Sequence, residues 1–312
     1  MSGYERVAAT LERLGLDVRR DEPLSRHTTF GIGGPADVFV IARSAEDLRR
    51  VVAAARDAGA PCFVLGSGSN ILVGDGGVRG VTVANEARRV GQPQPLGEGR
   101  VAVTAESGVS FAALARGMAR LGLAGIEWAS GIPGTLGGAV VYNAGAYGGC
   151  LADALREVTL INGSDRAQRV PAEDLDLVYR GSALTRGIFR DKVVLDATLV
   201  LWEGDARALD QRIAELDAKR LAAQPRGRNA GSVFKNPSDG PAWKLIDAVG
   251  LRGHRIGDAQ ISEKHCNFFV NVGQARAADV YALIRLARER VRERFGVELE
   301  LEVTLVGEGF DG

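Results

Sequence analysis

Two glycine-rich segments hold the residues best suited to ligand-binding chemistry. The stretch 131–149 reads GIPGTLGG followed by AVVYNAGAYGG, and seven of its nineteen residues are glycine. The segment 66–70 reads Gly-Ser-Gly-Ser-Asn and follows an apolar run. Glycine is expected where the backbone takes a positive φ or lies directly against a ligand. Both segments therefore indicate backbone N–H groups that cradle a phosphorylated ligand, although tight turns between core elements explain the same residues equally well.

The 66–70 loop and the segment 31–36 are not common nucleotide-binding loops. No Gly-Lys-[Ser/Thr] follows 66–70, so this loop is not a P-loop, and Ile71 stands where a Rossmann turn needs its third glycine. The spacing at 31–36 matches the dinucleotide fingerprint, but Pro35 lies inside it and a strand, not a helix, is predicted to follow. We therefore reject a Rossmann turn at 31–36.

Composition and charge narrow the class of protein. The chain has 312 residues, of which 46% are hydrophobic and 25% charged, as is ordinary for a globular protein of two or three domains. Its 39 acidic and 39 basic residues balance, so no large field would steer it to nucleic acid or an anionic membrane. Its three cysteines are far apart and lack a C-x-x-C pair, which argues against a disulfide framework and a metal site. No signal peptide or membrane span is seen, so we expect a cytoplasmic protein.

Alternating helices and strands are expected to position the glycine-rich segments. The predicted helices are 4–14, 44–59, 111–121, 206–221, 243–248 and 278–295. The predicted strands are 37–41, 61–65, 71–73, 81–83, 101–104, 158–161, 193–202 and 299–305. Ser44 and Ser110 are suited to cap the helices that follow them, and a polar linker is predicted around Pro23. Domain boundaries are predicted within 91–99 and after the 206–221 helix.

Eight motifs occur in the order and spacing of one enzyme family. They are His27-Thr28-Thr29-Phe30 with Gly33-Gly34-Pro35-Ala36, the 66–70 loop, Gly131 to Gly138, Asn143 to Gly148, Tyr179-Arg180 with Ser182, Ala230 to Pro237, Ser262 to His265 with Asn267, and Leu299-Glu300 with Glu302-Val303. The chain resembles the UDP-N-acetylenolpyruvylglucosamine reductases, FAD enzymes of peptidoglycan precursor synthesis, over nearly its whole length. Any one motif is a weak signal, whereas eight in sequence are highly specific.

The resemblance implies an α+β fold. The FAD-binding unit would be of the vanillyl-alcohol-oxidase-like (PCMH) type, with the flavin between two subdomains, and a separate α/β domain would bind the substrate. The implied FAD-binding subdomains are 1–88 and 89–222, with the C-terminal strand 299–312 returning to the second. The implied substrate-binding domain is 223–298.

The resemblance also implies a reaction and its binding residues. NADPH would reduce non-covalently bound FAD, which would then reduce UDP-N-acetylglucosamine enolpyruvate to UDP-N-acetylmuramate. The residues implied for FAD are Gly66, Ser67, Gly68, Ser69, Asn70, Gly131, Ile132, Pro133, Gly134, Gly137, Gly138 and Asn143. The residues implied for the substrate are Lys235, Asn236, Gln260, Lys264 and Asn267, which suit a diphosphate and a sugar. A monomer without a nucleic-acid or membrane partner is expected.

Three residues match the catalytic positions of the family. Hydride addition to an enolpyruvyl group drives negative charge onto its carboxylate, and the resulting enolate must be stabilised and protonated. Arg180 suits stabilisation, because a guanidinium is always charged and can grip a carboxylate with two parallel bonds. Ser232 matches the proton donor, and Glu302 matches a C-terminal glutamate that stabilises or orients the intermediate. Without the resemblance, Arg180 reads as a surface salt-bridge arginine and Ser232 as a turn serine.

The chain departs from the usual family pattern at three positions. Gly31 stands where a larger, often basic residue is common, Leu301 replaces a proline, and Gly181 is unusual within the Tyr-Arg-x-Ser motif. None of these changes removes a reactive group. The predicted strand 193–202 passes almost directly into the 206–221 helix, as in the shorter subclass that lacks a tyrosine-bearing clamp loop.

Two other functions fit part of the pattern. A flavin oxidase or dehydrogenase of the same superfamily would keep the FAD loops but not the set of Arg180, Ser232 and Glu302. A catalytically inactive FAD-fold protein would bind nucleotide-sugars without turnover. The three intact reactive positions argue against the inactive protein.

Overall fold

Contacts divide the chain into two compact units in the computed structural model, which describes residues 3–162, 166–189, 191–238 and 240–310. Unit 1 comprises Met1–Arg19, Phe39–Gly66 and Gly80–Arg220, and unit 2 comprises Arg20–Val38, Ser67–Arg79 and Leu221–Gly312. Each unit has its own hydrophobic core. The boundary after Arg220 lies close to the predicted 222/223 boundary, whereas the predicted 88/89 boundary falls inside unit 1.

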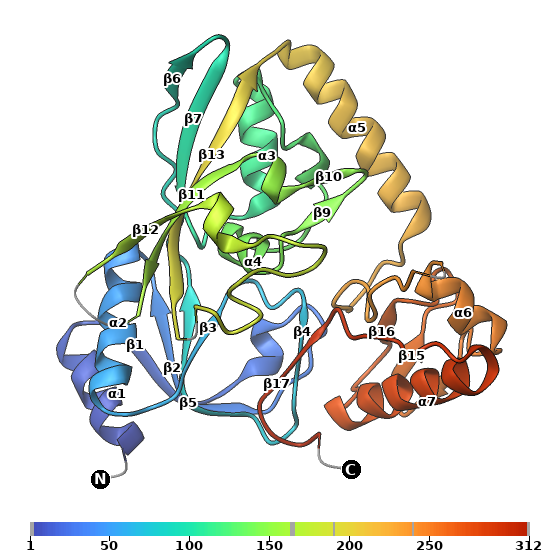
Figure 1. Ribbon diagram of the computed structural model, residues 1–312. Helices are drawn as coiled ribbons and strands as arrows, with labels where there is room; N and C mark the ends of the chain where they lie inside the picture. Colours follow the sequence, from blue (N-terminus) through green and yellow to red (C-terminus); the bar gives the residue numbers. More distant parts are fainter. Residues whose placement is uncertain (1–2, 163–165, 190, 239, 311–312) are drawn as a thin grey trace. The chain divides into compact units, whose positions relative to one another are not determined.

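Helices and strands alternate along the chain (Figure 1). The α-helices are α1 (Gly3–Arg13), α2 (Ala45–Asp57), α3 (Phe111–Arg120), α4 (Leu136–Val141), α5 (Ala206–Ala223), α6 (Ala242–Ala248) and α7 (Ala277–Phe295). The strands up to α4 are β1 (Asp17–Pro23), β2 (Pro35–Ala42), β3 (Cys62–Leu65), β4 (Ile71–Val73), β5 (Val78–Asn85), β6 (Gln94–Gly97), β7 (Arg100–Glu106) and β8 (Leu123–Ala124). The strands after α4 are β9 (Gly145–Ala146), β10 (Gly149–Cys150), β11 (Leu155–Ile161), β12 (Gln168–Pro171), β13 (Val193–Glu203), β14 (Arg255–Ile256), β15 (Ala259–Ile261), β16 (Phe269–Asn271) and β17 (Thr304–Val306).

The core of unit 1 lies on an antiparallel sheet with the strand order β12-β11-β13-β7-β6. Apolar residues of α3 and α4 join those of the sheet in one buried cluster. Phe111, the first residue of α3, packs edge-on against Trp128 with ring centroids 5.6 Å apart. Ser110 caps α3 as predicted, because its hydroxyl accepts from the Ala113 N–H at 3.3 Å. Because β6 and β7 form a hairpin, residues 94–97 of the predicted 91–99 boundary segment belong to this sheet.

A second sheet has the strand order β1-β2-β5-β3. The helix predicted after Ser44 is confirmed as α2, since the Ser44 hydroxyl accepts from the Asp47 N–H at 3.0 Å. The polar linker predicted around Pro23 is wrong, because this segment forms β1. A strand of mainly polar residues is possible there because β1 lies at the edge of the sheet. Pro23, which lacks an N–H for the ladder, is the last residue of β1.

The core of unit 2 forms where α7 packs against the antiparallel sheet β14-β15-β16 (Figure 1). The buried residues of α7 recur at helical spacing and are Ala277, Val280, Leu283, Ile284, Ala287 and Val291. Phe234 and Phe269 are fully buried in this cluster, with ring centroids 6.1 Å apart. Buried Asn271 fixes a distant loop here, since its Nδ2 donates to the Phe30 carbonyl and its Oδ1 accepts from the Gly273 N–H, both at 3.0 Å.

The last strand joins a different partner from the one expected. β17 pairs in parallel with β4, which places Leu305 opposite the fully buried Leu72. β4 belongs to the 1–88 segment, so the predicted return of 299–312 to the 89–222 segment is corrected. The residues at the two ends of the predicted domains, 1–2 and 311–312, lie outside the described residues.

Among the described residues there is neither a helix that could span a membrane nor a group of side chains that could hold a metal ion. None of the helices in these ranges combines the length and apolarity that a membrane span requires. In the same ranges, no group of three or more His, Cys, Asp and Glu side chains could hold a metal ion.

Asp196 lies in a row of polar side chains across the main sheet of unit 1. Its direct cross-strand neighbours are Thr159 on β11 and Glu106 on β7. Burial is the largest influence on Asp196 and raises its pKa above the ordinary value. A hydrogen bond with Thr159 opposes this rise, whereas the charge of Glu106 adds to it. The fold therefore favours the protonated form of Asp196.

Asp196→Asn is expected to raise Tm near neutral pH, because the buried carboxylate is costly there and the amide is not. A carboxyl whose pKa is raised on folding stabilises the fold at low pH and loses this effect as pH rises through the folded-state pKa. The gain in Tm should therefore disappear as pH falls toward 4. Thermal melts between pH 4 and 8 would measure it, and each kcal/mol corresponds to about 2–4 °C. The exposed Asp210→Asn variant is the control, and an Asp196→Asn gain that does not depend on pH would contradict the argument.

Candidate functional site

The 66–70 loop packs against the His27-Thr28-Thr29-Phe30 motif. Gly68 has a φ of 63°, and a Cβ on it would lie 2.2 Å from the His27 carbonyl oxygen. The Thr29 N–H donates to the Gly68 carbonyl at 3.1 Å. The hydroxyls of Ser67 and Ser69 lie 3.2 Å apart. Contact with the 27–30 segment therefore explains why position 68 is glycine, and two small hydroxyls remain on the loop.

Packing within the protein accounts for several glycines of the 131–149 stretch. A Cβ on Gly137 would lie 2.9 Å from Ser107 Cβ, and one on Gly149 would lie 2.5 Å from the Trp128 ring. A Cβ on Gly145 would meet the Gly149 carbonyl oxygen at 2.8 Å. These three positions need glycine whether or not a ligand is bound, so the prediction of ligand approach does not extend to the whole stretch.

Two other glycines of the predicted cofactor set lie around the side chain of Thr135. A Cβ on Gly66 would lie 2.7 Å from Thr135 Oγ1, so Gly66 of unit 1 packs against the 131–138 segment. Thr135 Oγ1 also accepts from the Gly138 N–H at 3.4 Å at the start of α4. Among the described residues, Thr135 Oγ1 at 3.7 Å is the only atom that a Cβ on Gly138 would meet within 4 Å. Packing therefore does not require glycine at position 138, and a bound ligand could.

Arg180 lies at the tip of a tight turn in unit 1. Val178 and Gly181 exchange two backbone hydrogen bonds of 3.0 and 3.2 Å, which close the turn. Arg180 has a φ of 54°, a conformation that is uncommon for a residue with a side chain. Its guanidinium carbon lies 5.4 Å from the centre of the exposed Tyr179 ring. Backbone strain of this kind is found at functional sites when the surrounding structure enforces it.

Asn143 and Val141, both in the 131–149 stretch, hold the turn of Arg180 in place by hydrogen bonds. Asn143 is buried, and its Nδ2 donates to the Val178 carbonyl at 3.0 Å while its Oδ1 accepts from the Ala152 N–H at 3.0 Å. On the other side of the turn, the Ser182 hydroxyl donates to the Val141 carbonyl at 2.6 Å. Asn143 was predicted to contact the cofactor, but both of its amide atoms bond to the protein. Its role in the structure is to hold the turn that carries Arg180.

Ser232 and Glu302 are brought together in unit 2. Val233, next to Ser232, accepts a hydrogen bond of 2.8 Å from the Glu302 N–H. On the other side, the Val233 N–H donates to the Asn267 carbonyl at 2.8 Å. The buried Asn267 side chain adds two bonds to Phe234, with Oδ1 accepting from its N–H at 2.9 Å and Nδ2 donating to its carbonyl at 2.8 Å. The Ser232 segment is therefore fixed between two other parts of the chain.

Asn70 fixes Glu302 from a third direction. Its Nδ2 donates to the Glu302 carbonyl at 3.1 Å, and its own carbonyl accepts from the Thr304 N–H at 3.0 Å. Sequence reasoning placed Asn70 with the cofactor and missed this role. No local signal could have indicated it, because the two residues are 232 positions apart.

The five residues predicted for substrate binding all make bonds within unit 2. Lys235 Nζ lies 3.3 Å from Glu300 Oε2, and Lys264 Nζ donates to the Leu221 carbonyl at 2.7 Å. Asn236 Oδ1 accepts from the N–H of Ala242, the first residue of α6, at 3.1 Å, and Gln260 Nε2 donates to the Gly253 carbonyl at 3.1 Å. Asn267 bonds to Phe234. The two lysines keep further N–H donors, since an ammonium has three, whereas Asn267 already uses both its oxygen and its nitrogen.

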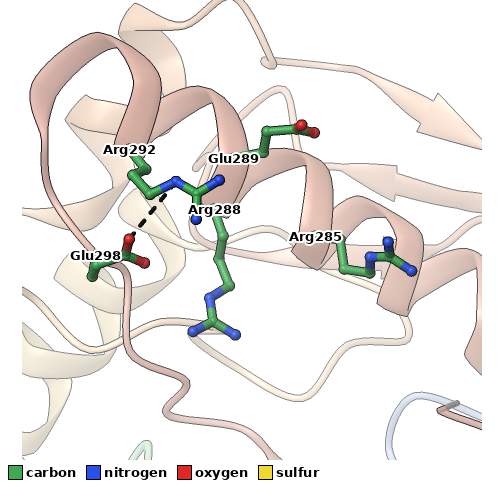
Figure 2. A pocket seen from close by; sticks show the side chains of 5 residues that line it. All are labelled: Arg285, Arg288, Glu289, Arg292 and Glu298. Atoms are coloured by element: carbon green, nitrogen blue, oxygen red, sulfur yellow. Dashed lines mark ion pairs between the residues drawn. The ribbon is translucent and has the colours of Figure 1, made fainter. Parts of the chain in front are cut away.

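A charged hollow on unit 2 involves none of the predicted site residues. It has a volume of about 270 Å³ and is lined by Arg285, Arg288, Glu289, Arg292 and Glu298. Figure 2 shows the three arginines along α7, with Arg292 Nε 3.8 Å from Glu298 Oε1. Glutamates of opposite charge reduce the positive charge of the hollow, and we assign it no function.

The three residues predicted to be catalytic are thus distributed over the two units. Arg180 belongs to unit 1 with the 131–149 stretch, and Ser232 belongs to unit 2 with Glu302. The passage from β13 to α5 takes only residues 204–205, so no clamp loop is inserted there.

Two family models match the sequence. Residues 36–170 match the family described as FAD binding domain. Residues 223–306 match the family described as UDP-N-acetylenolpyruvoylglucosamine reductase, C-terminal domain.

Whole-chain comparisons agree with these matches. The UDP-N-acetylenolpyruvoylglucosamine reductase of Moorella thermoacetica is 43% identical over 297 residues, covering 95% of each chain. The enzyme of the same name from Lachnoclostridium phytofermentans is 42% identical over 289 residues, covering 92% of each chain. The crystal structure of the Thermus caldophilus reductase has a TM-score of 0.77 at 38% identity and covers 94% of this chain and all of that one.

These similarities confirm two predictions made from the sequence. The fold is α+β, with an FAD-binding domain and a separate C-terminal domain, and the cofactor is FAD. The chain belongs to the UDP-N-acetylenolpyruvoylglucosamine reductase family.

Proposed function

We propose that this protein uses NADPH to reduce the enolpyruvyl ether of UDP-N-acetylglucosamine enolpyruvate, giving UDP-N-acetylmuramate. The observation that carries the proposal is the backbone hydrogen bond between Val233 and Glu302, because it joins the segment of Ser232, the proposed proton donor, to Glu302, its proposed partner. The names of relatives that match more than nine-tenths of the chain support it. The proposed role is in peptidoglycan precursor synthesis, and through it in cell wall formation, cell shape and cell division. We propose that the enzyme acts as a cytoplasmic monomer.

The glycine-rich segments fit the FAD that the family uses. Gly138 leaves open space at the start of α4, and the 66–70 loop offers two hydroxyls and several N–H groups. Such segments suit a diphosphate, because they combine donors with close backbone approach. The proposal assigns FAD binding to Gly66, Ser67, Gly68, Ser69, Asn70, Gly131, Ile132, Pro133, Gly134, Gly137 and Gly138. Asn143, which the sequence placed with them, is assigned to holding the turn that carries Arg180. When bound, FAD would supply the hydride carrier between NADPH and the substrate.

Arg180 is proposed to bind the enolpyruvyl carboxylate. Negative charge grows on this carboxylate as hydride reaches the neighbouring double bond, so a fixed cation lowers the barrier. The turn closed by Val178 and Gly181 and braced by Asn143 keeps Arg180 in place before the substrate arrives. A pre-positioned group needs no reorganisation during the reaction.

Ser232 is proposed to protonate the carbon next to the carboxylate. Its segment is bonded on both sides, so the hydroxyl would be presented from a rigid backbone. Glu302 would orient this proton transfer or stabilise the intermediate, with its own backbone held by Asn70. Lys235, Asn236, Gln260, Lys264 and Asn267 are proposed to form the surroundings of the UDP-sugar, with the lysine ammonium groups as the direct anion contacts.

An anaerobic visible spectrum tests the proposed function directly. NADPH should bleach the flavin band, and UDP-N-acetylglucosamine enolpyruvate should restore it. Bleaching without recovery would favour a flavin oxidase or dehydrogenase. A protein that cannot be loaded with FAD would contradict the proposal altogether.

Ser232→Ala is expected to leave flavin bleaching by NADPH near the wild-type rate and to slow recovery by about 10²–10⁴-fold, because a positioned proton donor is lost. Stopped-flow absorbance separates these two half-reactions. Ser238→Ala, in the same segment but exposed, is the matched control. Equal slowing of both half-reactions would show that Ser232 has only a structural role.

Arg180→Lys is expected to lower kcat/KM for the enolpyruvyl sugar by about 10²–10³-fold, because the ammonium keeps the charge but cannot form the bidentate grip. The rate of flavin reduction by NADPH should change little. Arg169→Lys, on the exposed surface of β12, is the control. An Arg180→Lys enzyme with wild-type recovery would exclude Arg180 from carboxylate binding.

A further inference from the structure

Arg220, near the end of α5, lies against the first residue of the central glycine stretch. Its side chain is partly buried, although arginine normally keeps its charged group in water. In the part of the chain that the structure describes, its guanidinium makes no hydrogen bond or ion pair. A partly buried cation with this environment calls for an explanation, since burial of a charge without a partner is costly.

Gly131 is the residue that makes room for Arg220. A Cβ at position 131 would lie 2.7 Å from Arg220 Cδ and 3.5 Å from its Nε. The φ of Gly131 is not positive, so the backbone conformation does not demand glycine here. The stem of Arg220 therefore packs against Gly131, which places the guanidinium beside the start of the 131–138 segment.

The carboxylate of Asp217, one turn before Arg220 on α5, is already bonded to other residues. Asp217 Oδ2 accepts from Arg116 at 2.7 Å, and Asp217 Oδ1 accepts from the Ser130 hydroxyl at 3.2 Å. These bonds anchor α5 to α3 and to the segment before Gly131. Asp217 thus fixes the position of Arg220 without forming an ion pair with it within 4 Å.

The surroundings of Arg220 do not favour its charge. Burial is the main influence on the guanidinium and lowers its pKa, whereas Tyr147 and Asp217 act in the opposite direction.

We infer that Arg220 binds a phosphate group of a nucleotide used by this enzyme. The inference rests on the proposed function, in which Arg180 takes the enolpyruvyl carboxylate. The strong anions that remain are the phosphates of FAD, NADPH and the UDP-sugar. A guanidinium suits them because its parallel N–H groups match two phosphate oxygens.

Arg220→Gln is expected to weaken the binding of a phosphorylated ligand by about 10–100-fold, the usual cost of losing a hydrogen bond to a charged group. Fluorescence titration of the apoprotein measures the Kd of FAD. Calorimetry on the holoenzyme measures the Kd of NADP⁺, UDP and uridine. Uridine lacks phosphate and should bind equally well to both proteins. The ligand that weakens identifies the source of the phosphate.

Three controls make the test specific. Lys219→Gln removes the exposed cation next to Arg220 and should change none of these Kd values. Arg220→Lys should give an intermediate loss, because charge is kept and the fork is lost. Gly131→Ala should displace the Arg220 stem and weaken the same ligand, and the double variant Gly131→Ala with Arg220→Gln should be no weaker than Arg220→Gln alone.

The outcomes separate this inference from the proposed function. If wild type binds FAD and UDP but every Kd of Arg220→Gln stays within about twofold, the inference is overturned and the proposed function stands. Equal weakening of UDP and uridine would also overturn it, because phosphate would not be the group recognised. If wild type binds none of the phosphorylated ligands, the proposed function fails as well. Circular dichroism melts would show whether each variant is folded.

Discussion

Buried backbone groups without a helix or strand partner are the constraint on which the loops of this protein depend. Each such N–H or C=O must find another hydrogen bond, because leaving it unpaired costs about 1–3 kcal/mol. Asparagine side chains meet this need at Asn143, Asn267 and Asn271, which all donate through Nδ2 and accept through Oδ1. One planar amide can satisfy a donor and an acceptor at once. The loops that carry Arg180 and Ser232 are therefore fixed by the protein itself.

Close packing within the protein explains several of the glycines in the 131–149 stretch that were predicted to face a ligand. Glycines 137, 145 and 149 are required by neighbouring atoms of unit 1, and Gly131 packs against the Arg220 side chain. Gly138 has no such packing reason. The stretch is dense in glycine mainly because several segments of the protein meet there, and the ligand accounts for a smaller share than the composition suggested.

Local features were predictable from the sequence, and long-range ones were not. The helices after Ser44 and Ser110 followed from capping residues and apolar spacing, and both are present. β1 was missed because an edge strand needs no apolar alternation, and the pairing of β17 with β4 was missed because nothing local specifies a partner 233 residues away. The site residues came from motifs of a known family. Their supports, such as Asn70 for Glu302 and Asp217 for the Arg220 helix, are visible only in three dimensions.

The pairing of β17 with β4 also affects the order in which the protein can be completed during synthesis. Unit 2 draws on residues 20–38, 67–79 and 221–312, and its parallel pair joins residues 71–73 to residues 304–306. A ribosome adds about 5–20 residues per second, so β4 emerges many seconds before its partner exists. Closing so long a loop is also an intrinsically slow step. The backbone around Glu302 can therefore reach its final position only after residues 304–306 have left the ribosome and paired with β4.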